Sequence, residues 1–182
     1  MKPTIYKIFG FARSGKDTLA DWVIKHRNAQ KFSFAAKVRK VAKALNVQVK
    51  INGKEVEFPY WSGDENCKRF PLVEVGHKLR QIIGQDVWVR ALENSLEFQA
   101  AQQENKNLVI NDCRYTNEKD IKLLPHYEHV NIYIERTGIL PQGAEAQSFK
   151  EIFEQPDFFD LYVRNDFNSV AEFHEFLKLR NL

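Results

Sequence analysis

A short run near the N-terminus combines glycines and cations at a spacing suited to phosphate binding. Gly10 and Gly15 enclose four residues, and Lys16 follows the second glycine directly. Glycine at both ends lets the backbone curl, so that several N–H groups point toward one spot where phosphate oxygens can accept them. Arg13 and Lys16 add two positive charges beside that spot. The pattern therefore predicts a binding loop for the phosphate tail of a nucleotide.

The setting of this loop supports the prediction. Residues 4–9 have the composition of a strand, and a helical segment begins near Lys16. The alternative, a glycine-rich turn with surface cations, is disfavoured because a cation at a helix N-terminus costs ~0.3–1 kcal/mol unless an anion is bound there. The residues predicted to contact the phosphates are Gly10, Ala12, Arg13, Ser14, Gly15, Lys16, Asp17 and Thr18.

Asp17 is the unusual member of the loop. In loops of this kind the residue after the lysine is usually Ser or Thr, whose hydroxyl binds Mg²⁺. A carboxylate oxygen also suits Mg²⁺, directly or through water. Alternatively, Asp17 stabilises the first helical turn electrostatically. Thr18 is then expected to face the α-phosphate.

A second acidic residue follows an apolar strand at 107–111. In an open parallel sheet, ligands bind at the carboxyl ends of the strands. We therefore expect Asp112 to lie in the same pocket as Lys16, either as a Mg²⁺ ligand or as a holder of the acceptor hydroxyl or phosphate. Arg114 could bind an acceptor phosphate through two N–H groups, which lysine cannot do.

Strand-like and helix-like runs alternate along the chain. Strands are predicted at 4–9, 31–34, 107–111, 129–136 and 160–164, with helical patterns between them. This alternation predicts an α/β fold with about five parallel strands and helices on both faces of the sheet. Residues 47–51 and 54–58 flank Asn52-Gly53 and predict a β-hairpin. With a loop at 59–71, this hairpin forms an insertion, 47–71, in a single domain covering 1–182.

Composition limits the function classes. The chain has 182 residues, 43% hydrophobic and 28% charged, which fits one globular domain and excludes a disordered tail. The net charge of +3 suits anionic small molecules and does not single out nucleic acid. Two cysteines make no disulfide framework, and no window approaches the ~20 apolar residues of a membrane span. We expect a cytoplasmic protein with no membrane partner and no nucleic-acid partner.

The end of the loop, 15–18, resembles the deoxynucleoside monophosphate kinases of tailed phages and related P-loop nucleoside monophosphate kinases. Further matches follow in order along most of the chain, at 33–35 with Arg39, Gln81 to Asp86 with Trp88 and Val89, 112–118, 135–136, and 160–166. Departures occur at 36–37, at His77, where an arginine is usual, and at 146–148.

The resemblance implies a P-loop NTPase-type three-layer sandwich and transfer of the γ-phosphoryl of ATP to a (deoxy)nucleoside monophosphate with Mg²⁺. Its implied partners are small-molecule nucleotides, in the host cytoplasm if the chain is phage-encoded. Lys16 would hold the donor β/γ oxygens, and Asp17 and Asp112 the metal. The residues implied to hold the transferring group and the acceptor phosphate are Arg13, Arg114 and Arg136. The acceptor-side residues are Arg39, Arg80, Gln81, Asp86 and Arg114.

Alternatives stay open at several points. The loop does not define the acceptor, so a P-loop kinase of another small metabolite and a non-catalytic nucleotide-binding regulatory module are the competing functions. Arg39 and Arg80 are alternatively solvated helix residues, and Asp86 is alternatively a helix N-cap. Residues 137–157 are interpreted as a lid or as an ordinary surface loop. The insertion could also support a homodimer.

Overall fold

The computed structural model describes residues 2–45, 48–51, 54–57, 65–119, 126–141, 144–155 and 157–180. The chain forms two compact units, here called the sheet unit and the helical unit. Met1–Phe32 and Ser95–Leu182 make up the sheet unit, and Ser33–Asn94 makes up the helical unit. The prediction of a single domain over 1–182 stays a prediction.

The sheet unit contains a five-stranded, all-parallel sheet of order β2-β5-β1-β6-β7. Its strands are β1 (Thr4–Phe9), β2 (Ala29–Phe32), β5 (Asn107–Cys113), β6 (Glu128–Glu135) and β7 (Leu161–Arg164). The central position of β1 explains its apolar sequence, because a strand between two partners and two helical layers has no solvent-facing side. The predicted α/β class with about five parallel strands is confirmed.

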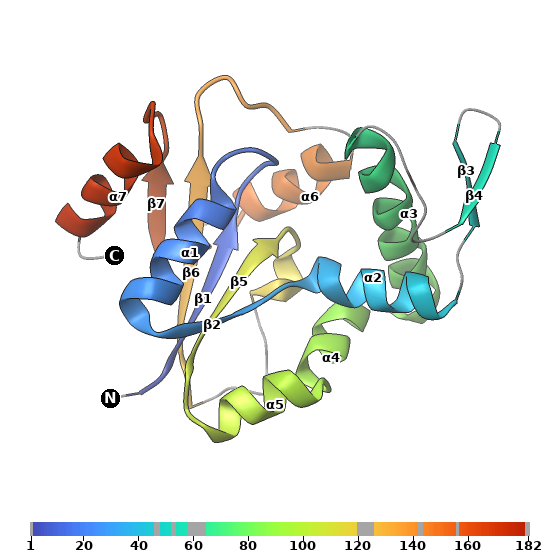
Figure 1. Ribbon diagram of the computed structural model, residues 1–182, viewed down its shortest axis with the longest axis horizontal. Helices are drawn as coiled ribbons and strands as arrows, with labels where there is room; N and C mark the ends of the chain where they lie inside the picture. Colours follow the sequence, from blue (N-terminus) through green and yellow to red (C-terminus); the bar gives the residue numbers. More distant parts are fainter. Residues whose placement is uncertain are drawn as a thin grey trace. The chain divides into compact units, whose positions relative to one another are not determined.

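Helices cover both faces of this sheet (Figure 1). On one face lie α1 (Lys16–Arg27) and α7 (Val170–Leu179), and on the other lie α5 (Leu96–Gln103) and α6 (Ala144–Phe153). The first face packs on an apolar stripe of α1 that recurs at helical spacing. The buried residues of this core are Ile8, Leu19, Ala20, Trp22, Val23, Ala29, Val109, Ile132, Ile134, Val163, Phe173 and Leu177.

The second face has an aromatic core. Phe9 of β1 makes edge-to-face contacts with Phe158 and Phe159, whose ring centroids lie 5.2 and 5.4 Å away. Phe149 of α6 is 1% exposed, and its ring centroid is 4.8 Å from that of Phe11, in the predicted phosphate loop. Such aromatic pairs add ~0.5–1.5 kcal/mol beyond their burial. The predicted phosphate loop therefore packs on α6 through the contact of Phe11 with Phe149.

The helical unit consists of α2 (Phe34–Ala44), β3 (Gln48–Ile51), β4 (Lys54–Glu57), α3 (Glu65–Ile83) and α4 (Val87–Glu93). Strands β3 and β4 pair antiparallel and confirm the predicted hairpin, while its Asn-Gly turn lies outside the described residues. The indole N–H of Trp88 donates to the carbonyl of Gly76 (3.0 Å) and links α4 to α3. No helix in the described part of the chain is long and apolar enough to cross a membrane.

Two predicted boundaries in this region are wrong. Strand β2 ends at Phe32 rather than 34, because Ser33 begins helix α2 as its N-cap and accepts a hydrogen bond from the Ala36 N–H (3.2 Å). The predicted loop at 59–71 is wrong from residue 65 onward, where α3 has already begun. The residues of this stretch are aromatic and polar without helical periodicity, so the sequence favoured a loop there. Pro71 falls inside the helix, although proline usually marks a helix end.

The segment 137–157 contains the helix α6 rather than loop alone. Ile152 is fully buried and Phe149 nearly so, which anchors this helix in the sheet unit. Closure of the segment as a lid stays a prediction.

We predict that Phe149→Ala lowers the free energy of unfolding by ~3–5 kcal/mol, because it removes a buried ring and leaves a cavity. Phe153→Ala, on the same helix but at a position 49% exposed, should cost clearly less. Chemical denaturation of both variants measures the difference. Equal losses would show that α6 is not anchored through Phe149.

Candidate phosphate-binding site

The predicted phosphate loop starts where the central strand β1 ends and runs into helix α1. Its backbone takes left-handed conformations at Gly10 (φ 149°), Arg13 (φ 69°) and Gly15 (φ 103°). The N–H of Ser14 donates to the carbonyl of Phe11 (3.2 Å), which closes a tight turn inside the loop. A positive φ is uncommon for arginine, and such strain clusters at ligand-binding sites. The loop is therefore curled as the glycine spacing predicted.

Both glycines are required by close packing as well as by φ. A Cβ on Gly10 would lie 2.3 Å from the carbonyl oxygen of Ile134, and one on Gly15 would lie 2.2 Å from Nδ2 of Asn165. Asn165 is 6% exposed, and its Nδ2 donates to the carbonyl of Ser14 (2.9 Å). Its backbone N–H donates to Glu135 at the end of β6 (2.8 Å). Asn165 thus fastens the loop to the ends of two strands.

Lys16 completes the loop electrostatically. Its Nζ donates to the carbonyl oxygens of Gly10 (2.8 Å) and Phe11 (2.6 Å), so its charge is held against the loop backbone. The N-cap residue of α1 is Gly15, which has no side chain to satisfy the first N–H groups of the helix. Ser14 Oγ is buried and has no hydrogen-bond partner among the described residues. These features make a site for an anion with several oxygens.

Asp17 is the exposed acidic group beside the loop, with a side chain 78% exposed. Its Oδ1 accepts from the side-chain amide of Asn111 in β5 (2.5 Å) and from Nζ of Lys31 in β2 (3.0 Å). These two contacts tie α1 to the ends of β2 and β5. Mg²⁺ is usually held by one or two carboxylates plus substrate phosphates, so an exposed Asp17 fits that role. No cluster of three or more metal-ligating side chains occurs among the described residues.

Asp112 lies where β5 departs from regular pairing. Between the pairs Lys7–Ile110 and Phe9–Cys113, β5 contains one residue more than β1. Such a bulge redirects the side chains at the end of a strand, and bulges are frequent next to active sites. Asp112, which is half-buried, lies in this irregular part of β5, one residue before the strand ends, and its place in one pocket with Lys16 stays a prediction.

The turn after β5 is shaped by a buried carboxylate. Glu118, 1% exposed, accepts hydrogen bonds from the backbone N–H groups of Arg114 and Tyr115, the latter at 3.0 Å. Its role is therefore structural, and the half-buried Arg114 is carried on a turn of fixed backbone geometry.

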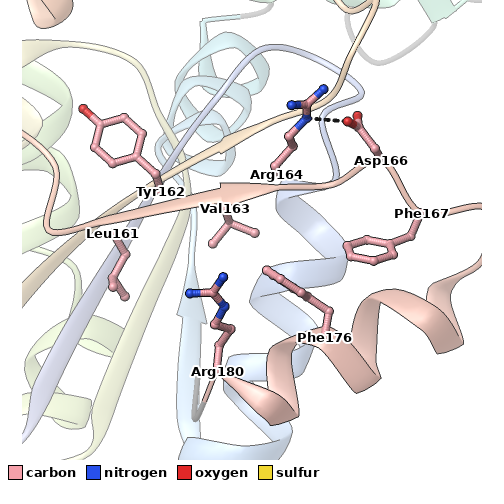
Figure 2. Close-up of a pocket in the computed structure, with 8 residues that line it drawn as sticks. All are labelled: Leu161, Tyr162, Val163, Arg164, Asp166, Phe167, Phe176 and Arg180. Atoms are coloured by element: carbon pink, nitrogen blue, oxygen red, sulfur yellow. Dashed lines mark hydrogen bonds and ion pairs between the residues drawn. The ribbon is translucent and has the colours of Figure 1, made fainter.

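Arg136 follows the end of β6 and is exposed. The next residue, Thr137, donates through its backbone N–H and through Oγ1 to the carboxylate of Asp166, both at 2.8 Å. Arg164 also donates to this carboxylate, as Figure 2 shows. These hydrogen bonds, first those from Thr137, lower the pKa of Asp166. The backbone beside Arg136 is thus fixed by a short polar network.

The structure brings one set of predicted residues together in the sheet unit, at or beside the carboxyl edge. This set comprises Gly10, Ala12, Arg13, Ser14, Gly15, Lys16, Asp17, Thr18, Asp112, Arg114 and Arg136. The remaining predicted residues, Arg39, Arg80, Gln81 and Asp86, lie in the helical unit. All roles assigned to individual residues stay predictions.

For two of the predicted acceptor-side residues, the structure tests the structural alternative to substrate binding. Arg80 is not a solvated helix residue, since it is 5% exposed and its guanidinium donates to the carbonyl of Gln85 (2.6 Å). Asp86 occupies the N-cap position of α4 but makes no side-chain capping bond. Its carboxylate instead pairs with Arg90 at 3.2 Å. The N-cap interpretation therefore holds for position but not for hydrogen bonding.

A cavity lies beside β7, lined in part by Phe176 of α7. Its volume is about 520 Å³. Figure 2 shows Leu161, Val163 and Phe176 on one side of the strand, while Tyr162 points to the other. None of the predicted site residues lines this cavity, so it is not the predicted phosphate site.

Sequence reasoning missed three residues that hold the loop. Asn165 and Asn111 fasten the loop and the first turn of α1, and Lys31 pairs with Asp17. The available signal was their position, since Asn111 ends a predicted strand, Asn165 directly follows one and Lys31 begins one. A sequence cannot show which of several such residues points toward the loop.

Comparison with solved structures identifies the class of fold. Dephospho-CoA kinase from Campylobacter jejuni matches with a TM-score of 0.50 and 16% identity, over 100% of this chain and 97% of that chain. A sugar kinase from Janibacter sp. HTCC2649 matches with a TM-score of 0.47 and 13% identity, over 99% and 92%. No protein-family model and no curated protein matches the sequence. The chain therefore shares its α/β fold with this dephospho-CoA kinase.

We predict that Gly15→Ala destabilises the protein more than Gly138→Ala, and that it abolishes phosphate binding by the loop. Both glycines have positive φ, but a Cβ at Gly138 meets nothing within 4 Å, whereas at Gly15 it collides with Asn165. The comparison isolates the collision from the cost of positive φ. Thermal unfolding measures the loss of stability, and ATP titration measures binding by the loop. Equal stability and equal ATP binding of the two variants would contradict the prediction.

The network around Asp166 predicts an acid-dependent contribution to stability. Its pKa is lowered below the ordinary 3.8, so its contribution is complete above that value and disappears as pH falls through the lower folded-state value. Asp166→Asn should therefore reduce the free energy of unfolding by a constant amount at neutral pH, with the difference shrinking only below pH 3.8. Denaturation of both proteins across this range measures it. A difference that changes between pH 5 and 8 would point to another group.

Proposed function

We propose that the protein is an ATP-dependent phosphotransferase, and that its acceptor is a (deoxy)nucleoside monophosphate. The observation that carries the proposal is the curled loop in which Gly10 and Gly15 admit no Cβ and Lys16 lies on the loop's own carbonyls. A phosphate oxygen is a stronger acceptor for this lysine than a neutral carbonyl, because both partners are then charged.

Phosphoryl transfer asks little covalent chemistry of a protein. It requires two phosphates held in line, their charge neutralised and water kept away. In this proposal the loop N–H groups and Lys16 bind the donor phosphates, and Arg13, Arg114 and Arg136 bind the transferring group and the acceptor phosphate. Asp17 and Asp112 hold Mg²⁺, which when bound neutralises charge on the phosphate oxygens.

The choice of acceptor is supported by the residues that resemble the deoxynucleoside monophosphate kinases. They extend beyond the loop to Arg114, Arg136 and the α3–α4 segment with Gln81 and Asp86. A kinase of another small metabolite is the second candidate, because a dephospho-CoA kinase shares this fold and a fold does not define the acceptor. A regulatory module that binds ATP without transferring phosphate is the third.

One assay separates these candidates. The protein is incubated with ATP, Mg²⁺ and each ribo- and deoxyribonucleoside monophosphate in turn, and diphosphate formation is measured. Turnover with one or more of these acceptors supports the proposal. No turnover with any of them would overturn the proposed acceptor class, and ATP binding retained without transfer would then favour the regulatory module.

We predict that Lys16→Met lowers the rate of phosphoryl transfer by at least ~10³-fold while the protein stays folded. The substitution removes the positive charge that would bind the transferring phosphoryl group. Lys25→Met is the matched control, since Lys25 lies on the same helix, is exposed, and is far along α1 from the loop. Steady-state kinetics and circular dichroism measure the two effects. A folded Lys16→Met protein with nearly normal rate would mean that the donor site is placed wrongly.

A further inference from the structure

Strand β1 carries a lysine where the fold calls for an apolar residue. Lys7 lies in the central strand, three residues before the phosphate loop, and is 0% exposed. Burying an amine is costly unless it is hydrogen-bonded or paired with opposite charge. The contacts that compensate this burial therefore indicate what Lys7 does.

Those contacts reach the segment that follows β5. Nζ of Lys7 donates a hydrogen bond to the backbone carbonyl of Lys119, at the end of the turn formed by residues 113–119. Nζ also lies 3.1 Å from Nδ1 of His129 in β6, which accepts when the ring proton is on Nε2. One side chain from β1 thus binds a segment 112 residues away in sequence.

The same turn is held from within by Glu118, whose carboxylate binds the backbone N–H groups of Arg114 and Tyr115. Cys113, the last residue of β5, is buried next to the turn. Burial raises the pKa of its thiol, the nearby charges of Glu118 and Asp112 raise this pKa further, and the charge of Lys7 lowers it. Lys7 and Glu118 therefore act on one small, buried region.

We propose that Lys7 is a positioning residue: it fixes the turn 113–119, which carries Arg114 and follows Asp112, to the strand that carries the phosphate loop. Lys7 is buried below the edge of the sheet and touches no substrate in this proposal. It acts by keeping the acceptor-side residues of the turn at a constant distance from the donor loop. This consequence for catalysis rests on the proposed function, whereas the attachment of the turn does not.

The attachment is tested by thiol labelling. Cys67→Ser leaves Cys113 as the only thiol, and its labelling rate under native conditions measures opening of the turn. Lys7→Met should speed labelling by about 10- to 100-fold, the range expected when a charged hydrogen bond is lost. Ile8→Ala, a buried change on the opposite face of the same strand, is the control for general loss of stability. Rates are compared after correction for each variant's free energy of unfolding.

Labelling of Lys7→Met no faster than that of the control would overturn the proposal. Glu118→Ala should speed labelling as Lys7→Met does, and acceleration by Glu118→Ala alone would show that Lys7 does not hold the turn. Should Lys7→Met fail to fold, hydrogen exchange in the wild-type protein decides instead. The amides of Arg114 and Tyr115 should then be protected as strongly as those of β1, and fast exchange would overturn the proposal.

Kinetics test the consequence for catalysis. Lys7→Met should lower kcat/KM for the acceptor by about 10- to 100-fold, with a much smaller change in KM for ATP, because only the acceptor side loses its fixed position. Equal effects on ATP and acceptor would reject a positioning role. If no acceptor supports turnover even in the wild-type protein, the proposed function fails, and thiol labelling still decides whether Lys7 holds the turn.

Discussion

The whole site depends on how closely the loop backbone approaches the strands behind it. Gly10 lies against the carbonyl of Ile134, and Gly15 lies against the side chain of Asn165. At these distances no side chain larger than hydrogen fits. The benefit is a loop held by strands β6 and β7 as well as by its own residues, so that its N–H groups keep their direction before any ligand binds. Such preorganisation is what electrostatic binding of phosphate requires.

The close contact between the loop and these strands also connects elements that are distant in sequence. Asn165 follows β7, the edge strand, and can reach the loop only because β7 pairs with β6 in fixed register. On the other side of β1, Asn111 and Lys31 reach Asp17 from the ends of β5 and β2. Contacts from four strands therefore converge on the loop and the first turn of α1. A change in the register of any of these strands would move a group that positions the phosphate site.

Much of this architecture is visible in the sequence, for physical reasons. A buried parallel strand must be apolar on both sides, and a helix must repeat its apolar residues with its own period, so β1, α1 and the hairpin β3–β4 were predicted well. The phosphate loop was predictable because nine consecutive residues contain all its requirements. The start of α3 was missed because residues 59–71 are aromatic and polar without helical periodicity, so the local sequence does not show that a helix begins at Glu65. The roles of Lys7 and Asn165 were not predictable, since each depends on a contact across more than a hundred residues.

The difference between local and long-range contacts also explains why the donor site is easier to predict than the acceptor site. A phosphate tail is recognised by backbone N–H groups and one lysine in a continuous segment, and its chemistry is the same for every P-loop kinase. An acceptor is recognised by side chains from several elements, and those proposed for this protein are Arg114, Arg136 and residues of α2 to α4. Arg80 and Asp86 show the difficulty, because each has a structural partner within its own unit, Gln85 and Arg90 respectively. An arginine that closes a turn between two helices cannot also be assigned to a substrate from its residue type. Specificity for the acceptor must therefore be determined by measured turnover, whereas the proposed donor site can be argued from the shape of the loop.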